Sequence, residues 1–170
     1  VWVGTTDRVV SRLDPRSGTF RHFPPDPQDP TALGHPFVTS LAPDPAGGLW
    51  VGTYGGLYWL DPAGERFTAY RHSPDDPLSL SDNAINDLLV DRSGALWIAT
   101  GDGLNRRDPR SGRFTIYRND PADPQSLSAS SGWSLAEDAQ GGIWVGTFGW
   151  GLNRLDPATG RVTRYRHDPQ

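Results

Sequence analysis

The sequence contains no cysteine and no lysine, so each of its 16 basic residues is an arginine. Without cysteine there is no disulfide framework, no thiolate metal site and no cysteine nucleophile. The net charge of −4 and the pI near 5.4 give no basic surface of the kind that binds nucleic acid. No apolar run approaches the ~18 residues of a membrane span, so we expect no membrane contact by this segment. Because the chain opens at Val1, we expect any signal peptide or anchor to lie outside it.

Glutamate is almost absent as well, because Glu65 and Glu137 are the only two and the other acidic residues are aspartates. Aspartate, glycine and proline favour turns over helices, and the chain has 20 glycines and 16 prolines. Apolar residues at 35% and charged residues at 21% are those of a folded domain and not of a disordered one. This composition predicts an all-β chain that turns often.

A tryptophan motif recurs along the whole chain at intervals of 47 or 48 residues. The strings VWVGT, LWVGT, LWIAT and IWVGT surround Trp2, Trp50, Trp97 and Trp144, respectively. Each is followed 11 or 12 residues later by an Asp-Pro pair. Self-similarity of this kind is the signature of a repeat architecture. A residue shared by every repeat cannot mark one site, so we interpret the four tryptophans as structural core.

Within the third repeat, four short segments rich in branched or aromatic residues predict strands at 85–90, 96–100, 104–107 and 114–118. Turn sequences such as Asp-Pro-Arg-Ser-Gly at 108–112 separate them. Four antiparallel strands per ~47 residues are typical of a β-propeller blade. We therefore predict one β-propeller segment over 1–170, with four blades at approximately 1–36, 37–83, 84–130 and 131–170.

The first blade is predicted to lack its inner strand, because the sequence begins within the second strand of the repeat. Thr6, Asp7 and Arg8 also stand where the other repeats have glycines. A ring without one inner strand leaves an open edge. We expect a partial propeller that is completed by further blades or by a second chain.

The combined motifs resemble the two-component regulator propeller repeat. The resemblance is carried by LWVGTYGGLYWLDP at 49–62, by the third repeat at 96–128 and by the Ser-Leu-Ser connections at 79–81 and 126–128. It implies the periplasmic or extracytoplasmic sensor half of a bacterial hybrid histidine kinase, a class whose members are taken to sense oligosaccharides. A second similarity, to streptogramin lyase-type propellers, is carried by Asp-Pro-x-Thr-Gly at 156–160.

Residues that break the repeat are the candidates for a specific site. Trp133 stands near the start of a predicted inner strand, where the other blades have Thr39 and Asn86. Phe148 and Trp150 lie in a turn of the same blade that is one residue longer than its counterparts. Both features fall at one end of a four-stranded meander, so we expect them to gather at the mouth of the channel. The corresponding turn residues of the preceding blades, Tyr54 and Asp102, complete the candidate set.

Aromatic faces beside polar turns suit sugar rings, which offer apolar CH patches together with hydroxyls. Local packing of Trp150 over its own loop is the alternative. Trp59 stands where other blades have arginine and is expected to pack within its blade. Those arginines are expected to form a solvated or interblade ion-pair row, with an anion site as the alternative.

Neither a catalytic centre nor a metal site is predicted, and no cofactor is implied. The Asp-Pro-x-Asp-Pro runs at 26–30 and 120–124 are interpreted as turns, since their prolines spread the carboxylates apart. His72 and His167 occupy one repeat position on different blades, too far apart to act together.

These observations favour a non-enzymatic sensing module that binds an oligosaccharide or another small ligand. Two alternatives stay open: a scaffold that holds protein partners, and a lyase of the streptogramin type.

Overall fold

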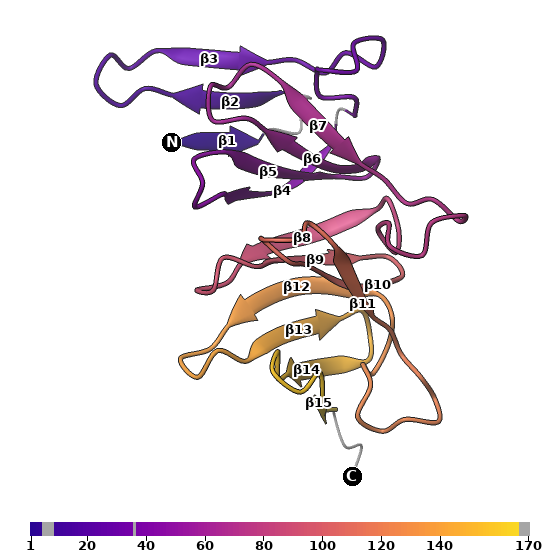
Figure 1. Cartoon of the computed structure of the whole chain (residues 1–170). Helices are drawn as coiled ribbons and strands as arrows, with labels where there is room; N and C mark the ends of the chain where they lie inside the picture. The colour runs from indigo at the N-terminus through magenta and orange to yellow at the C-terminus, as the bar shows by residue number, and fades with distance from the viewer. Residues whose placement is uncertain (5–8, 36, 167–170) are drawn as a thin grey trace.

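The computed structural model describes residues 1–4, 9–35 and 37–166 and forms four antiparallel sheets, which we call blades one to four (Figure 1). Thr6, Asp7, Arg8 and His167 lie outside the described residues. Blade one has three strands, and each other blade has four in chain order. The strands are β1 Trp2–Gly4, β2 Val10–Leu13 and β3 Phe20–Phe23; β4 Val38–Pro43, β5 Leu49–Thr53, β6 Gly56–Leu60 and β7 Phe67–Tyr70; β8 Ile85–Val90, β9 Leu96–Thr100, β10 Gly103–Arg107 and β11 Phe114–Tyr117; β12 Gly132–Glu137, β13 Ile143–Thr147, β14 Gly151–Leu155 and β15 Val162–Tyr165.

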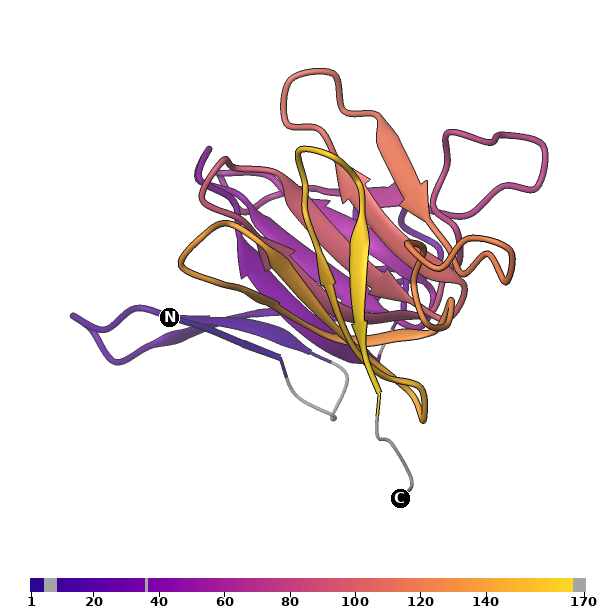
Figure 2. The ribbon, with the colours of Figure 1, turned by 90° about the horizontal axis from the view of Figure 1, so that it is seen from below.

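This architecture confirms the predicted all-β partial propeller, with its first blade one strand short. The strands β4, β8 and β12 pack beside one another from blade to blade and are therefore the inner strands. Figure 2 shows the successive sheets overlapping along the line of stacking, with the connections 71–84 and 118–131 projecting from them. No helix that could cross a membrane occurs in the described part of the chain.

Aspartate side chains form the turns between strands. In the turn between β8 and β9, Asp91 Oδ1 accepts hydrogen bonds from the backbone N–H of Ser93 and of Ala95, at 2.8 and 3.0 Å. Gly94 completes that turn with φ of 83°, a conformation that a residue with a side chain rarely adopts. The same use of aspartate recurs at the other tight turns, and this explains why the chain holds so much aspartate and so little glutamate.

Apolar side chains fill the space between successive blades and form the core. Trp50 and Leu57 of blade two pack against Ile85, Leu96 and Phe114 of blade three. Equivalent clusters join blade one to blade two and blade three to blade four. The repeat tryptophans of blades one to three therefore lie between blades, in the clusters that join each blade to the next.

The arginine position in the third strand of each blade acts within its own blade. Arg106 lies over the ring of Trp97, with 5.6 Å between Cζ and the ring centroid, and Arg154 pairs with Asp138 at 2.7 Å. Arg106 therefore departs from the expected ion-pair row: among the described residues it lies over the ring of Trp97 and makes no ion pair with a carboxylate. Trp59, which replaces this arginine in blade two, packs on Trp50 as expected and donates from Nε1 to Asp44 Oδ2 at 2.8 Å.

Candidate ligand-binding site

Each inner strand contains a β-bulge at the same repeat position. The pairing register shifts between Val38 and Ser40 in β4, and between the corresponding residues of β8 and β12. One residue of each inner strand is thereby left without a partner in the ladder: Thr39, Asn86 and Trp133. A bulge locally bends the strand and can re-aim the side chain of the extra residue. We call these three the bulge residues.

Hydrogen bonds between blades hold the backbone next to the bulges. The carboxylate of Asp87 accepts from Ser40 Oγ of blade two at 2.9 Å and from the backbone N–H of Leu135 of blade four at 2.8 Å. Asn86 Nδ2 donates to the carbonyl oxygen of Gly132 at 2.7 Å. The three inner strands are therefore fixed to one another at the end where the bulges lie.

The bulge residues line one pocket of about 300 Å³, a volume at the lower end of the range for small-molecule sites. Its remaining lining residues are Phe37, Val38 and Tyr54. Thr39 Oγ1 is buried and has no hydrogen-bond partner. A buried hydroxyl without a partner carries a desolvation penalty that a ligand hydroxyl could remove. The pocket thus combines aromatic walls with an unused polar atom.

The sequence-predicted aromatic residues fall at this end of the blades. Trp133 is 54% exposed and Phe148 is 71% exposed, with 5.7 Å between their ring centroids. Tyr54, also exposed, reaches the same pocket as Trp133 from blade two. Trp150 is exposed in the turn that carries Phe148 and is not among the residues that line the pocket.

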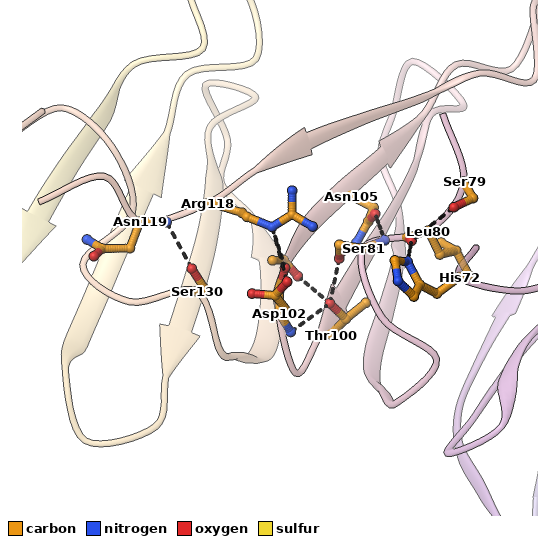
Figure 3. A network of polar contacts seen from close by, with 11 residues as sticks. His72, Ser79, Leu80, Ser81, Thr100, Asp102, Asn105, Arg118, Asn119 and Ser130 are labelled. Atoms are coloured by element: carbon orange, nitrogen blue, oxygen red, sulfur yellow. Dashed lines mark hydrogen bonds and ion pairs between the residues drawn. The ribbon is translucent and has the colours of Figure 1, made fainter. Parts of the chain in front are cut away.

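Asp102 has a different environment from the other candidates. Its carboxylate pairs with Arg118 at 3.2 Å, and its backbone N–H donates to Thr100 Oγ1 at the same distance (Figure 3). Both side chains of the ion pair are largely exposed. Asp102 does not line the pocket that holds Tyr54 and Trp133.

The Ser-Leu-Ser connection forms a buried polar junction beside this turn (Figure 3). The backbone N–H of Ser81 donates to Asn105 Oδ1 at 2.9 Å, and Asn105 Nδ2 donates to Ser81 Oγ at 2.7 Å. Leu80 between the two serines is buried, and its carbonyl oxygen lies 2.7 Å from His72 Nδ1. Blade four repeats the junction with Ser128 and Asn153. The motif that carries the family resemblance is therefore a structural device that ties the connections into blades three and four to the sheets that follow them.

Sequence reasoning missed Phe37, Val38, Thr39 and Asn86 as lining residues of the pocket. Thr39 and Asn86 share the repeat position of Trp133, and that shared position was the available signal. The repeat shows which residues are equivalent, but it does not show that the backbone bulges there.

A larger groove of about 850 Å³ lies at the opposite ends of the inner strands, lined in part by Leu41, Val90 and Arg92. Arg92 pairs with Glu137 at 2.9 Å and donates to the carbonyl oxygens of Asp138 and Ala139. The guanidinium of Arg92 thus already has hydrogen-bond partners within the protein, unlike Thr39 Oγ1 in the smaller pocket.

The three described histidines have separate partners. His22 Nδ1 lies 2.9 Å from Ser11 Oγ, His35 Nδ1 accepts from the backbone N–H of Phe37 at 3.3 Å, and His72 contacts Leu80 as above. Over residues 1–4, 9–35 and 37–166, no three histidine or acidic side chains are grouped so as to hold a metal ion.

Comparison with known proteins places this geometry in a family. The profile of the SMP-30/gluconolactonase/LRE-like region matches residues 1–134, and that of the two component regulator propeller matches residues 127–149. The chain is a member of the SMP-30/gluconolactonase/LRE-like family, and it carries a two-component regulator propeller repeat at residues 127–149. No curated protein matches it.

Solved structures agree with this assignment. The extracellular domain of a hybrid two-component system from B. thetaiotaomicron is 34% identical, with a TM-score of 0.73 over 79% of this chain and 19% of that one. A second such domain from the same organism is 23% identical, with a TM-score of 0.73 over 97% of this chain and 20% of the other. Virginiamycin B lyase from Staphylococcus aureus, solved with quinupristin, is 15% identical, with a TM-score of 0.69 over 99% of this chain and 52% of the lyase.

The regulator propeller described here spans about a fifth of the length of the two extracellular domains that it matches. The likeness to the lyase, at its low identity, is a likeness of fold alone.

Proposed function

We propose that this chain is a non-enzymatic, ligand-sensing part of the extracytoplasmic propeller of a two-component signalling protein, and that its ligand is an oligosaccharide. The location and the signalling role are supported by the similarity to extracellular domains of hybrid two-component systems. Ligand occupancy would act on a kinase module through the geometry of the propeller.

The observation that carries the binding role is the convergence of Tyr54, Thr39 and Trp133 on one pocket. The two aromatic side chains offer apolar faces on which the CH groups of a sugar ring can stack. The hydroxyl of Thr39 has no partner in the protein and is shielded from solvent, and it would reach a sugar hydroxyl once the side chain turns toward the pocket. Phe148 packs against the ring of Trp133, with 5.7 Å between the ring centroids.

The test is a glycan array probed with the labelled chain, followed by titration of each bound glycan with tryptophan fluorescence as the readout. We expect Trp133→Ala and Tyr54→Ala each to weaken binding at least tenfold. Trp150→Ala should weaken it less, because Trp150 does not line the pocket. Phe20→Ala is the matched control: it removes an exposed aromatic ring from the opposite end of blade one and should leave affinity unchanged.

Binding that survives Trp133→Ala together with Tyr54→Ala would overturn this pocket as the site. Failure of the wild-type chain to bind any glycan would overturn the oligosaccharide assignment. Stable oligomers in light scattering together with that failure would favour the scaffold function instead.

A further inference from the structure

At each bulge, the residue whose side chain lines the pocket takes no part in the hydrogen-bonded ladder between the strands. Ser40 pairs with Gly52 and Val38 with Thr53, so Thr39 contributes nothing to the ladder between β4 and β5. The same is true of Asn86 in β8 and of Trp133 in β12. A substitution at a bulge residue therefore changes the pocket without removing a cross-strand pair.

The three bulge residues differ where the backbone repeats. A threonine, an asparagine and a tryptophan occupy one repeat position, and all three reach one pocket because their inner strands are neighbours. Hydrogen bonds between blades come from Ser40 and Asp87, which follow two of the bulge residues, and from Asn86 Nδ2, which donates to the carbonyl oxygen of Gly132. The three blades thus place different side chains, from one repeat position, around a single pocket.

The chemistry of the lining excludes a site for charge. Neither an arginine nor an acidic residue is among the six lining residues. Asn86 commits its amide nitrogen to Gly132 and keeps its carbonyl oxygen as an acceptor, while Thr39 offers a hydroxyl. The carboxylate of Asp87, one residue beyond the bulge of β8, is the charged group nearest in sequence, and it would repel an anion. This lining disfavours an acidic ligand and suits one that carries hydroxyls and presents an apolar face to Trp133.

We propose that the bulge position of the inner strand is the specificity-determining position of this propeller, and that Thr39, Asn86 and Trp133 select an electrically neutral sugar ring over an acidic one. This inference rests on the proposed function, since it requires that the pocket binds a sugar. It goes further than that function, because it names the residues that determine specificity and the class of sugar that they favour.

The experiment compares neutral hexose oligosaccharides with uronic-acid oligosaccharides of the same length, measured by titration calorimetry on the whole chain. The wild type should prefer the neutral set. Thr39→Arg places a cation at a bulge and should shift the ratio of affinities about three- to fivefold toward the acidic set, the effect of one partly exposed ion pair. The matched control is Thr68→Arg, which adds the same charge at an exposed position of β7 and should leave the ratio unchanged.

A second readout does not depend on the ligand. Thr39→Arg and Trp133→Asn should each unfold within a few degrees of the wild type, because neither residue takes part in the ladder. This inference is overturned if the wild type binds both sets equally, or if Thr39→Arg and Thr68→Arg shift the ratio of affinities by the same factor. In either case the binding of glycans itself leaves the proposed function standing. Large losses of thermal stability in the bulge variants overturn it as well. Absence of binding to either set overturns both proposals.

Discussion

Trp97 donates a hydrogen bond from Nε1 to Oδ2 of Asp91, at 2.8 Å, across the turn that joins β8 to β9 in blade three. Oδ1 of the same carboxylate closes that turn by accepting from the backbone N–H of Ala95. Blade four repeats the bond between Trp144 and Asp138 at 3.0 Å. One aspartate thus fixes both the turn and the rotamer of the tryptophan that fills the space before the next blade.

The first prediction concerns this aspartate. Asp91→Ala leaves two buried donors, the N–H of Ala95 and Nε1 of Trp97, without partners, and each unsatisfied group costs about 1–3 kcal/mol. We expect the free energy of unfolding, measured by urea denaturation, to fall by roughly 3 kcal/mol. Asp26→Ala is the control, because Asp26 accepts from Gln28 in an exposed turn and should lose under ~1 kcal/mol. Equal losses at the two positions would contradict this role.

The second prediction compares two tryptophans of the same motif. Trp97 is fully buried between blades three and four, whereas Trp144 stacks on Tyr165 at 5.2 Å and stays partly exposed. Trp97→Ala should cost about 3–5 kcal/mol, the range for a buried aromatic side chain. Trp144→Ala should cost no more than about half of that by the same measure, because it opens a smaller cavity. Chemical denaturation of both variants tests the difference, and a Trp144 loss as large as that of Trp97 would refute it.

The outer face of blade four extends this comparison. Leu152 is 41% exposed, while its counterparts Leu57 and Leu104 are buried by the following blade. Fusing a further copy of the third repeat after Gln170 should cover Leu152 and raise the cost of Trp144→Ala toward that of Trp97→Ala. An unchanged cost in the fusion would show that this face does not accept a blade of the same kind.

The third prediction is loss of stability in acid. Hydrogen bonds from Arg16 N and from Ser17 hold the pKa of Asp14 below its usual 3.8. Hydrogen bonds to Ser111 likewise lower the pKa of Asp108. Burial raises the pKa of Asp91, but hydrogen bonds from Ser93 and Trp97 outweigh burial and the net shift is downward. The hydrogen-bonded ion pair with Arg154 lowers the pKa of Asp138 well below its usual range.

A carboxyl whose pKa is lower in the folded than in the unfolded protein stabilises the fold above the unfolded pKa and loses that contribution as pH falls. The melting temperature should therefore stay level from pH 7 to about 5 and fall below about pH 4. Asp108→Asn should reduce the steepness of the acid loss, because the amide does not titrate. Melting curves at stepped pH measure this. A melting temperature that rises as the pH falls below 4 would contradict this prediction.

The periodicity of the sequence predicted the fold closely, because a repeat constrains every blade at once. The expected strands of blade three agree with β8 to β11 to within one residue at each end. The pocket was harder to predict from the sequence. Its members Thr39 and Asn86 look like ordinary strand residues. The register shift that frees them lies beside a hydrogen bond between Ser40 and Asp87, which are 47 residues apart in the sequence. The pairing of Asp102 with Arg118, likewise, depends on side-chain reach across two turns of one blade.

The last prediction uses a natural exchange between blades. Blade two has Gly34 and Tyr58 where blade three has Ser81 and Asn105. A Cβ at Gly34 would lie 2.9 Å from the hydroxyl of Tyr58, so the tyrosine requires the glycine. That hydroxyl then accepts from Arg71 at 3.1 Å in place of the serine–asparagine junction.

Asn105→Tyr alone should therefore destabilise blade three strongly, because the new ring meets the side chain of Ser81. Ser81→Gly alone should also destabilise it by removing the hydroxyl that bonds Asn105 and Thr100. The double variant should be more stable than the sum of the two losses predicts, by about 1–3 kcal/mol. A double-mutant cycle by urea denaturation measures this coupling, and the reciprocal pair Gly34→Ser with Tyr58→Asn provides its control. Additive losses in both blades would mean that the two positions are filled independently and that the exchange has no steric cause.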